Sequence, residues 1–107
     1  MPDFQEIFTE LKTDILDLAK LTFKNYKDDA SKDVKDFLAK SEEKLKRWTL
    51  LLTNNDINKD EFEVLVKGLK DGAEMKLLKQ TGLAKVRIDE FKNSLINLIT
   101  DTVFKFL

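Results

Sequence analysis

The sequence predicts an all-helical protein, and three observations support that prediction. Four stretches carry an apolar residue every three or four positions, which is the spacing of one buried helix face. Charged residues make up 36% of the chain, against about 25% in typical domains, as helices with solvated outer faces require. Only three glycines and one proline are present to interrupt helices. At 107 residues, we expect a single helical domain over residues 1–107.

The first stripe predicts a helix over residues 4–26. Its polar face is acidic at the start and basic at the end, which matches the helix dipole. The early carboxylates lie opposite the apolar stripe, so we interpret them as solvated; they are Glu6, Glu10, Asp14 and Asp17. The stripe itself consists of Phe4, Ile7, Phe8, Leu11, Ile15, Leu18, Ala19, Thr22, Phe23 and Tyr26.

The second stripe predicts a helix over residues 34–52. Three times in this segment an acidic residue is followed four positions later by a basic one. Each such pair adds a few tenths of a kcal/mol to helix stability. The segment 44–48 is the one dense basic cluster that contains an aromatic residue, but Trp48 falls on the apolar stripe. We therefore assign Trp48 to the core and expect no nucleic-acid partner. The stripe consists of Val34, Phe37, Leu38, Ser41, Leu45, Trp48, Leu51 and Leu52.

A sharp chain reversal is predicted between Thr53 and Asn58. Asn58 can cap the next helix and Glu61, three residues on, can complete a capping box. The oxygen-rich residues from Asn54 onward resemble a calcium loop in composition only. Lys59 and Leu65 stand where such a loop needs Gly and Glu, so we expect helix capping here and no metal.

The third stripe spans residues 62–78 and the fourth, after Gly82, spans residues 84–106. Gly68 and Gly72 lie beside the third stripe, where they either receive a bulky neighbour such as Trp48 or are simply tolerated. The two stripes consist of Phe62, Leu65, Val66, Leu69, Ala73, Met75, Leu77 and Leu78, then Ala84, Ile88, Phe91, Leu95, Leu98, Ile99, Val103 and Phe106.

Two junctions decide the topology, and the apolar pattern does not show whether the helix breaks or continues at either of them. Near residues 28–31, Asp29 or Ser31 can cap a new helix, yet the helical spacing also continues. Near Gly82 the helix can end or run on. If both junctions break, the chain forms an antiparallel up-down-up-down four-helix bundle, which is the fold we predict. If they do not, it forms a long two- or three-helix hairpin that dimerises into a four-helix bundle.

The residue types present argue against catalysis. The chain has no histidine and no cysteine, which removes common metal ligands and redox groups and leaves the serines without a histidine partner to activate them. We therefore expect a non-enzymatic protein with no catalytic residue, no cofactor and no metal. A net charge of −1 gives no general attraction to nucleic acid or anionic lipid.

The first six residues lack the pattern of a signal peptide, and no apolar run approaches the roughly 18 residues of a membrane span. We expect no transmembrane segment and a cytoplasmic location. An exported mature domain fits the same sequence.

The last stripe carries more large apolar residues than one helix face can absorb. Ile96, Phe104, Phe106 and Leu107 project away from the line of Leu95, Ile99 and Val103, so we predict that these four form an interaction surface. The hypothesis is a protein that acts through helix-to-helix contact, as a homodimer or with a protein partner. The alternative is binding of lipid or another apolar ligand through amphipathic helices, with lipid the less favoured partner.

Overall fold

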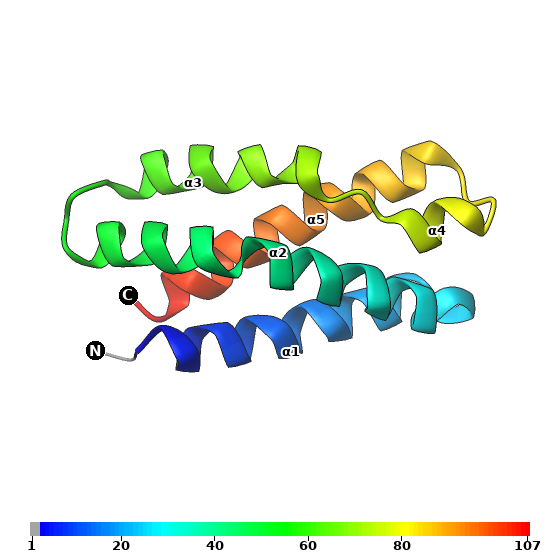
Figure 1. The fold of residues 1–107 in the computed structure, drawn as a ribbon, viewed down its shortest axis with the longest axis horizontal. Coiled ribbons are helices and arrows are strands. Elements are labelled where there is room, and N and C mark those ends of the chain that lie inside the picture. The colour runs from blue at the N-terminus through cyan, green and yellow to red at the C-terminus, as the bar shows by residue number, and fades with distance from the viewer. Residues whose placement is uncertain (1–2) are drawn as a thin grey trace.

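The protein is described by a computed structural model that covers residues 3–107, and within this range it is all-helical with no strand. The described residues form an elongated body of 43 × 22 × 19 Å (Figure 1). The all-helical prediction is confirmed. The elements, in order, are α1 (Phe4–Thr22), a 3-10 helix (Lys24–Tyr26), α2 (Lys27–Thr53), α3 (Lys59–Lys67), a second 3-10 helix (Gly68–Gly72), α4 (Lys76–Gln80) and α5 (Lys85–Lys105).

The four longer helices run along the long axis of the body, and the short α4 lies at one end (Figure 1). α1 packs against α2 and α5, and α3 packs against the same two helices. The start of α1, the turn between α2 and α3, and the end of α5 lie together at the other end, which we call the α2–α3 end (Figure 1).

The core lies where the apolar faces of the helices meet. Of the positions predicted to be buried, Leu45, Phe62 and Leu95 are fully enclosed, and Phe91 and Leu69 are nearly so. Trp48 is half-buried and packs against this core rather than projecting into solvent. The apolar stripes therefore identified the interior correctly at their centres.

The first junction lies earlier than the spacing suggested. α1 ends at Thr22, and α2 already begins at Lys27, so neither Asp29 nor Ser31 is a helix cap. Phe23 explains the change, because its side chain turns inward and is only 2% exposed. Its ring meets that of Phe91 in α5 edge-to-face, with centroids 4.8 Å apart. The helix thus ends where a buried aromatic side chain anchors the turn.

The third stripe is not one helix, which corrects the expectation for residues 62–78. The α-helix ends at Lys67, tightens into a 3-10 helix from Gly68 to Gly72, and resumes only at Lys76. A glycine costs about 1 kcal/mol relative to alanine in a helix, so two of them weaken this segment. A side chain built on either glycine would meet nothing within 4 Å, so neither of them receives a bulky neighbour such as Trp48.

Asp33 in α2 holds the displaced helix α4 in place. Its carboxylate accepts hydrogen bonds from the backbone N–H groups of Leu77 (3.1 Å) and Leu78 (2.8 Å). These are first-turn donors that have no partner inside a helix, and Met75, which precedes α4, supplies no capping side chain. Met75 adopts left-handed backbone angles (φ 51°) with its side chain buried. A carboxylate from a distant helix therefore caps α4.

The second junction breaks at the predicted glycine. α4 ends at Gln80, and Gly82 has φ +84°, a conformation that side-chain-bearing residues rarely adopt. α5 then begins at Lys85. Because both junctions reverse, no helix in residues 3–107 has the double length that a long two-helix hairpin requires.

Two of the carboxylates expected to be solvated instead connect α1 to α5. Asp14 accepts a hydrogen bond from the Thr102 hydroxyl at 3.1 Å, and Glu10 pairs with Lys105 at 3.1 Å. Both carboxyl side chains are half-buried. They lie at the edge of the apolar stripe, close enough to α5 to be covered when the helices pack. Glu6 and Asp17 are solvated as expected.

The predicted reversal between Thr53 and Asn58 is confirmed, including its capping box. The Asn58 side chain accepts from the Glu61 N–H at 2.8 Å, and the Glu61 carboxylate accepts from the Asn58 N–H at 3.0 Å.

Replacing Asn58 with alanine is expected to lower the free energy of unfolding by about 1 kcal/mol, because one N–H group of α3 loses its partner. Urea unfolding measures the change. The control is Asn97→Ala, an exposed asparagine inside α5, where no loss is expected. Equal stability of the two variants would show that the cap contributes nothing.

Candidate functional site

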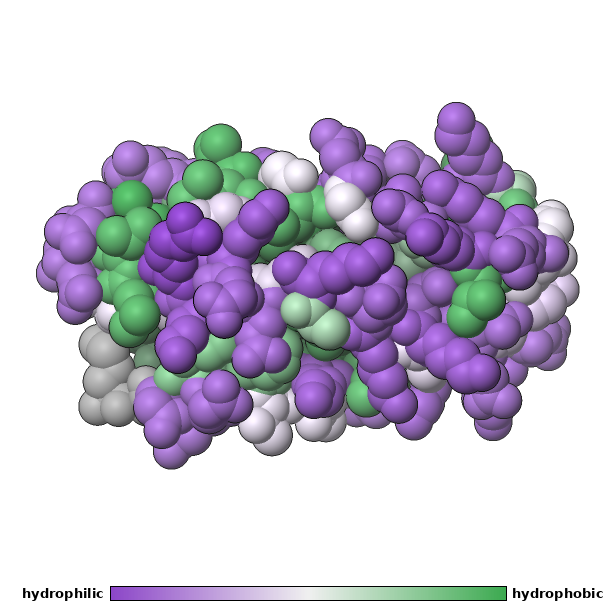
Figure 2. All heavy atoms as spheres, in the orientation of Figure 1, coloured by the Kyte–Doolittle hydropathy of each residue, from purple (hydrophilic) through white to green (hydrophobic). Residues whose placement is uncertain are grey.

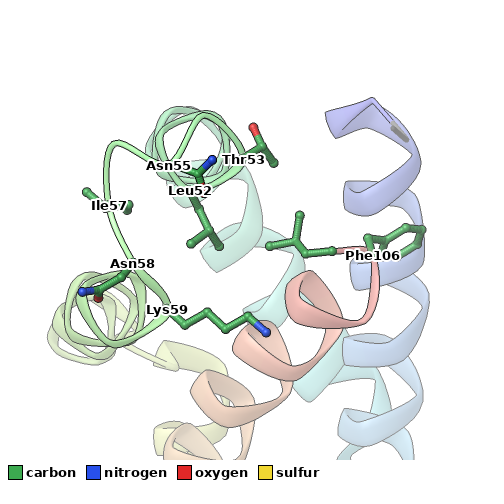
Figure 3. Close-up of a pocket in the computed structure, with 8 residues that line it drawn as sticks. Leu52, Thr53, Asn55, Ile57, Asn58, Lys59 and Phe106 are labelled. Atoms are coloured by element: carbon green, nitrogen blue, oxygen red, sulfur yellow. The ribbon is translucent and has the colours of Figure 1, made fainter.

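A groove of about 670 Å³ lies at the α2–α3 end (Figure 3). It lies between the α2–α3 turn and the end of α5, with α1 beyond (Figure 3). The end of α5 contributes two apolar side chains, and the turn side contributes two apolar and four polar ones. The lining residues are Leu52, Thr53, Asn55, Ile57, Asn58, Lys59, Phe106 and Leu107.

The turn side of the groove is held by short-range hydrogen bonds. The N–H groups of Asp56 and Ile57 both donate to the carbonyl oxygen of Leu51, at 2.8 and 3.3 Å. Asn55 adopts left-handed backbone angles with φ 62°, which asparagine tolerates better than most residues. The capping box then starts α3. This wall is thus a defined turn that places Ile57 beside the core.

The opposite side is formed by the last turn of α5. Phe104 packs on Phe62 with ring centroids 5.7 Å apart, and the Lys59 ammonium lies 5.1 Å from the Phe104 centroid. In Figure 3 the Lys59 side chain extends from α3 across toward the end of α5. A cation over an aromatic face is attracted by the ring quadrupole. Lys59 thus covers Phe104 and places one positive charge at the edge of the groove.

The four residues predicted to form an interaction surface occupy three different environments. Ile96 is only 4% exposed, so it belongs to the protein's own core and leaves the predicted surface. Phe104 is half-buried beneath Lys59, outside the groove lining. Phe106 is half-buried and Leu107 is 46% exposed, and both line the groove. The structure therefore brings two of the four residues together.

Sequence reasoning missed the other side of the groove. The apolar spacing marks Leu52 only as a core position, yet it lines the opening together with Ile57, Phe106 and Leu107. The available signal was the sharp turn itself, because a turn that reverses an apolar stripe leaves the ends of two stripes side by side.

Elsewhere the exposed apolar side chains are scattered. Leu21, Leu50, Val64 and Val86 are each at least half exposed, but they lie on different helices. Figure 2 shows small apolar groups separated by hydrophilic surface on one face, one of them at the end where α5 finishes. Single exposed apolar residues are normal, whereas several around one groove indicate a binding surface.

The chemistry of the groove suits binding. Its lining offers one ammonium, two side-chain amides and one hydroxyl beside four apolar side chains. Within residues 3–107, no three Asp or Glu side chains lie close enough to hold a metal ion together. No helix in the described part of the chain has the length and hydropathy to cross a membrane. Comparisons of the chain with protein-family models, curated proteins and solved structures found no match.

Proposed function

We propose that the protein is a non-enzymatic helical interaction protein that binds through the groove at the α2–α3 end, and that a second copy of the chain is its partner. The observation that carries this proposal is the gathering of Leu52, Ile57, Phe106 and Leu107 around one opening. Burying such side chains against a partner is favourable by roughly 25 cal/mol per Å² of apolar surface.

The proposal includes the fold. We assign the chain to the antiparallel up-down-up-down four-helix bundles. In this assignment α3, the second 3-10 helix and α4 together take the place of the third helix of the bundle. The packing of α1 and α3 against both α2 and α5 supports this assignment. A cytoplasmic location belongs to the same proposal, and an exported mature domain remains the alternative.

The charges around the groove favour a symmetric contact between two copies. Lys59 lies at the rim, and the exposed Asp56 and Asp60 lie beside it in the sequence. A two-fold interface places the same patch on both sides, so Lys59 of one copy can meet Asp56 or Asp60 of the second copy. The patch is thus complementary to itself in charge as well as in its apolar centre.

The size of this end limits the strength of the contact. The two short dimensions of the body are 22 and 19 Å, so an end-on contact covers roughly a few hundred Å² on each copy. Stable interfaces bury about 800 Å² per partner. We therefore expect weak self-association, with a dissociation constant of about 0.1 mM or more.

Leu107→Glu is expected to abolish this self-association, because it places a charge at the most exposed apolar position of the groove. Sedimentation velocity over a range from about 0.02 to about 2 mM measures the shift toward dimer. Leu21→Glu is the matched control, because Leu21 is an exposed leucine outside the groove lining. A wild-type protein that stays monomeric throughout, or a Leu107→Glu variant that dimerises as the wild type does, contradicts the proposal.

The runner-up function is binding of an apolar ligand in the same groove. Its volume falls within the roughly 300–1,000 Å³ of small-molecule sites, and Lys59 can pair with a carboxylate at the rim. A titration with a medium-chain fatty acid, monitored by amide chemical shifts, distinguishes ligand binding from self-association. Shifts at Ile57 and Leu107 in a monomeric sample favour the ligand over the second copy.

A further inference from the structure

A second pocket, of about 400 Å³, lies where the end of α4 meets the start of α5, at the opposite end of the body from the groove described above. Three of its lining residues are lysines on different turns, and two are apolar. The lining consists of Lys79, Leu83, Lys85, Ile88, Asp89 and Lys92.

The positive charges of this pocket are not neutralised by the residues around it. Asp89 is the one acidic residue in the lining, and both of its oxygens are taken by the Lys70 ammonium, at 3.2 and 3.3 Å. Among residues 3–107, Lys79, Lys85 and Lys92 form no ion pair. The pocket therefore carries about three unpaired positive charges over an apolar floor.

The start of α5 adds to this positive potential. Ala84 precedes the helix and offers no capping side chain, and the first turn contains no acidic residue. Helix starts usually attract acidic side chains because their free N–H groups carry partial positive charge. Here the first helical residue is Lys85 instead. Nothing in this turn offsets the charge of the lysines.

Both burial and the neighbouring lysines act on Lys92. Partial burial lowers the pKa of the Lys92 ammonium, and the neighbouring charges of Lys79 and Lys70 lower it further. Asp89 and Asp71 act in the opposite direction, but the pKa remains below its ordinary value. An anion in the pocket would reverse this shift. Glu74, an acid within electrostatic range of Lys79, pairs with Lys76 at 3.2 Å.

We propose that this pocket binds the dianionic phosphate group of a phosphomonoester. Lys79, Lys85 and Lys92 contact the phosphate oxygens, and Leu83 and Ile88 contact the esterified part. A phosphomonoester carries a charge of about −1.5 to −2 at pH 7, which matches three ammonium groups better than a single carboxylate does. Lysine ammoniums are point charges that suit phosphate oxygens. This site is separate from the proposed self-association groove and does not depend on it.

The test is a titration of the isotope-labelled chain at low salt with three probes: glycerol 3-phosphate, inorganic phosphate and dimethyl phosphate. The first two are dianions and the third is a monoanion of similar size. We expect amide shifts confined to residues 79–92 and binding of dimethyl phosphate about tenfold weaker, because it carries half the charge. Equal binding of all three probes, or shifts spread over the surface lysines, overturns the proposal.

Vesicles distinguish a lipid head group from a soluble ester. Phosphatidic acid presents a phosphomonoester and phosphatidylglycerol a phosphodiester, so vesicles of phosphatidylcholine with either lipid are compared by co-sedimentation. Retention by phosphatidic acid alone supports the proposed chemistry with a lipid as its source. Binding of soluble glycerol 3-phosphate without vesicle retention supports it with a soluble source. Equal retention by both lipids contradicts it.

Lys92→Gln and Lys79→Gln are each expected to weaken glycerol 3-phosphate binding at least about fivefold. Lys44→Gln, on the exposed face of α2, is the matched control and should bind as the wild type does. Lys92→Gln should melt no lower than the wild type, because the lowered pKa of Lys92 means that its charge is unfavourable in the folded state. Unchanged affinity in both pocket variants overturns the assignment.

The pH dependence provides a second readout. Affinity should fall as pH rises through the lowered pKa of Lys92, and should also fall below about pH 6, where the ester takes up a proton. Saturation with glycerol 3-phosphate should raise the pKa of the Lys92 ammonium. The side-chain resonances of Lys92, recorded as a function of pH, measure that pKa. An unchanged Lys92 pKa in the saturated protein contradicts direct contact with the phosphate.

Discussion

Replacing Asp33 with alanine is expected to lower the free energy of unfolding by about 2 to 4 kcal/mol. The carboxylate accepts two backbone hydrogen bonds, from Leu77 and Leu78. A hydrogen bond to a charged group is worth about 1.5 to 3 kcal/mol, and water can replace part of the Leu77 bond because that bond is only partly buried. Asp33 is 8% exposed, so water replaces it poorly and the buried Leu78 N–H loses its partner. Urea unfolding measures the global effect, and hydrogen exchange at Leu77 and Leu78 measures the local one.

Two variants separate this role from a general effect of charge. Asp36→Ala removes an exposed carboxylate one turn away that pairs with Lys40, so we expect a change within about 0.5 kcal/mol. Asp33→Asn retains one oxygen acceptor but turns an amide donor toward the second N–H group, so its loss should be intermediate. Equal stability of Asp33→Ala and Asp36→Ala would show that α4 is held by packing alone.

Asp33 also shows what the sequence could not predict. The apolar spacing located the core positions and the capping residues located the reversal at Asn58, because both signals depend on neighbours within a few residues of each other. The cap on α4 joins residues 44 and 45 positions apart, and nothing in a local pattern marks Asp33 as different from Asp36. The break in the third stripe depends on this distant contact as well as on Gly68 and Gly72, so spacing alone overestimated the length of that helix.

The candidate groove was half predictable for a similar reason. An excess of apolar residues near the C-terminal segment was visible in the sequence, and Phe106 and Leu107 do line the groove. Whether Ile96 faced inward depended on how α5 packs between its neighbours, and it is buried. The basic pocket depends on three-dimensional placement in the same way. Lys79 and Lys92 come from different helices, and only the reversal at Gly82 brings them to one cavity.

Phe91→Ala should produce the largest loss of stability among the variants considered, about 3 to 5 kcal/mol. The Phe91 ring is 2% exposed and meets the Phe23 ring edge-to-face, so its removal leaves a cavity and also releases the turn between α1 and α2. Domains of this size have a total stability of about 5 to 15 kcal/mol, so the variant could be largely unfolded. Phe91→Leu, expected to cost roughly 1 to 2 kcal/mol, keeps the effect measurable.

The Phe23 contact makes this prediction specific. Phe23→Leu, Phe91→Leu and the double variant form a cycle whose coupling energy should be about 0.5 to 1.5 kcal/mol, the usual value for an edge-to-face pair. Val86→Ala is the control within α5, because its side chain is 67% exposed and its truncation should change stability by less than about 0.5 kcal/mol. Additive losses at Phe23 and Phe91 would mean that the two rings contribute independently. The end of α1 would then be set by its own residues rather than by α5.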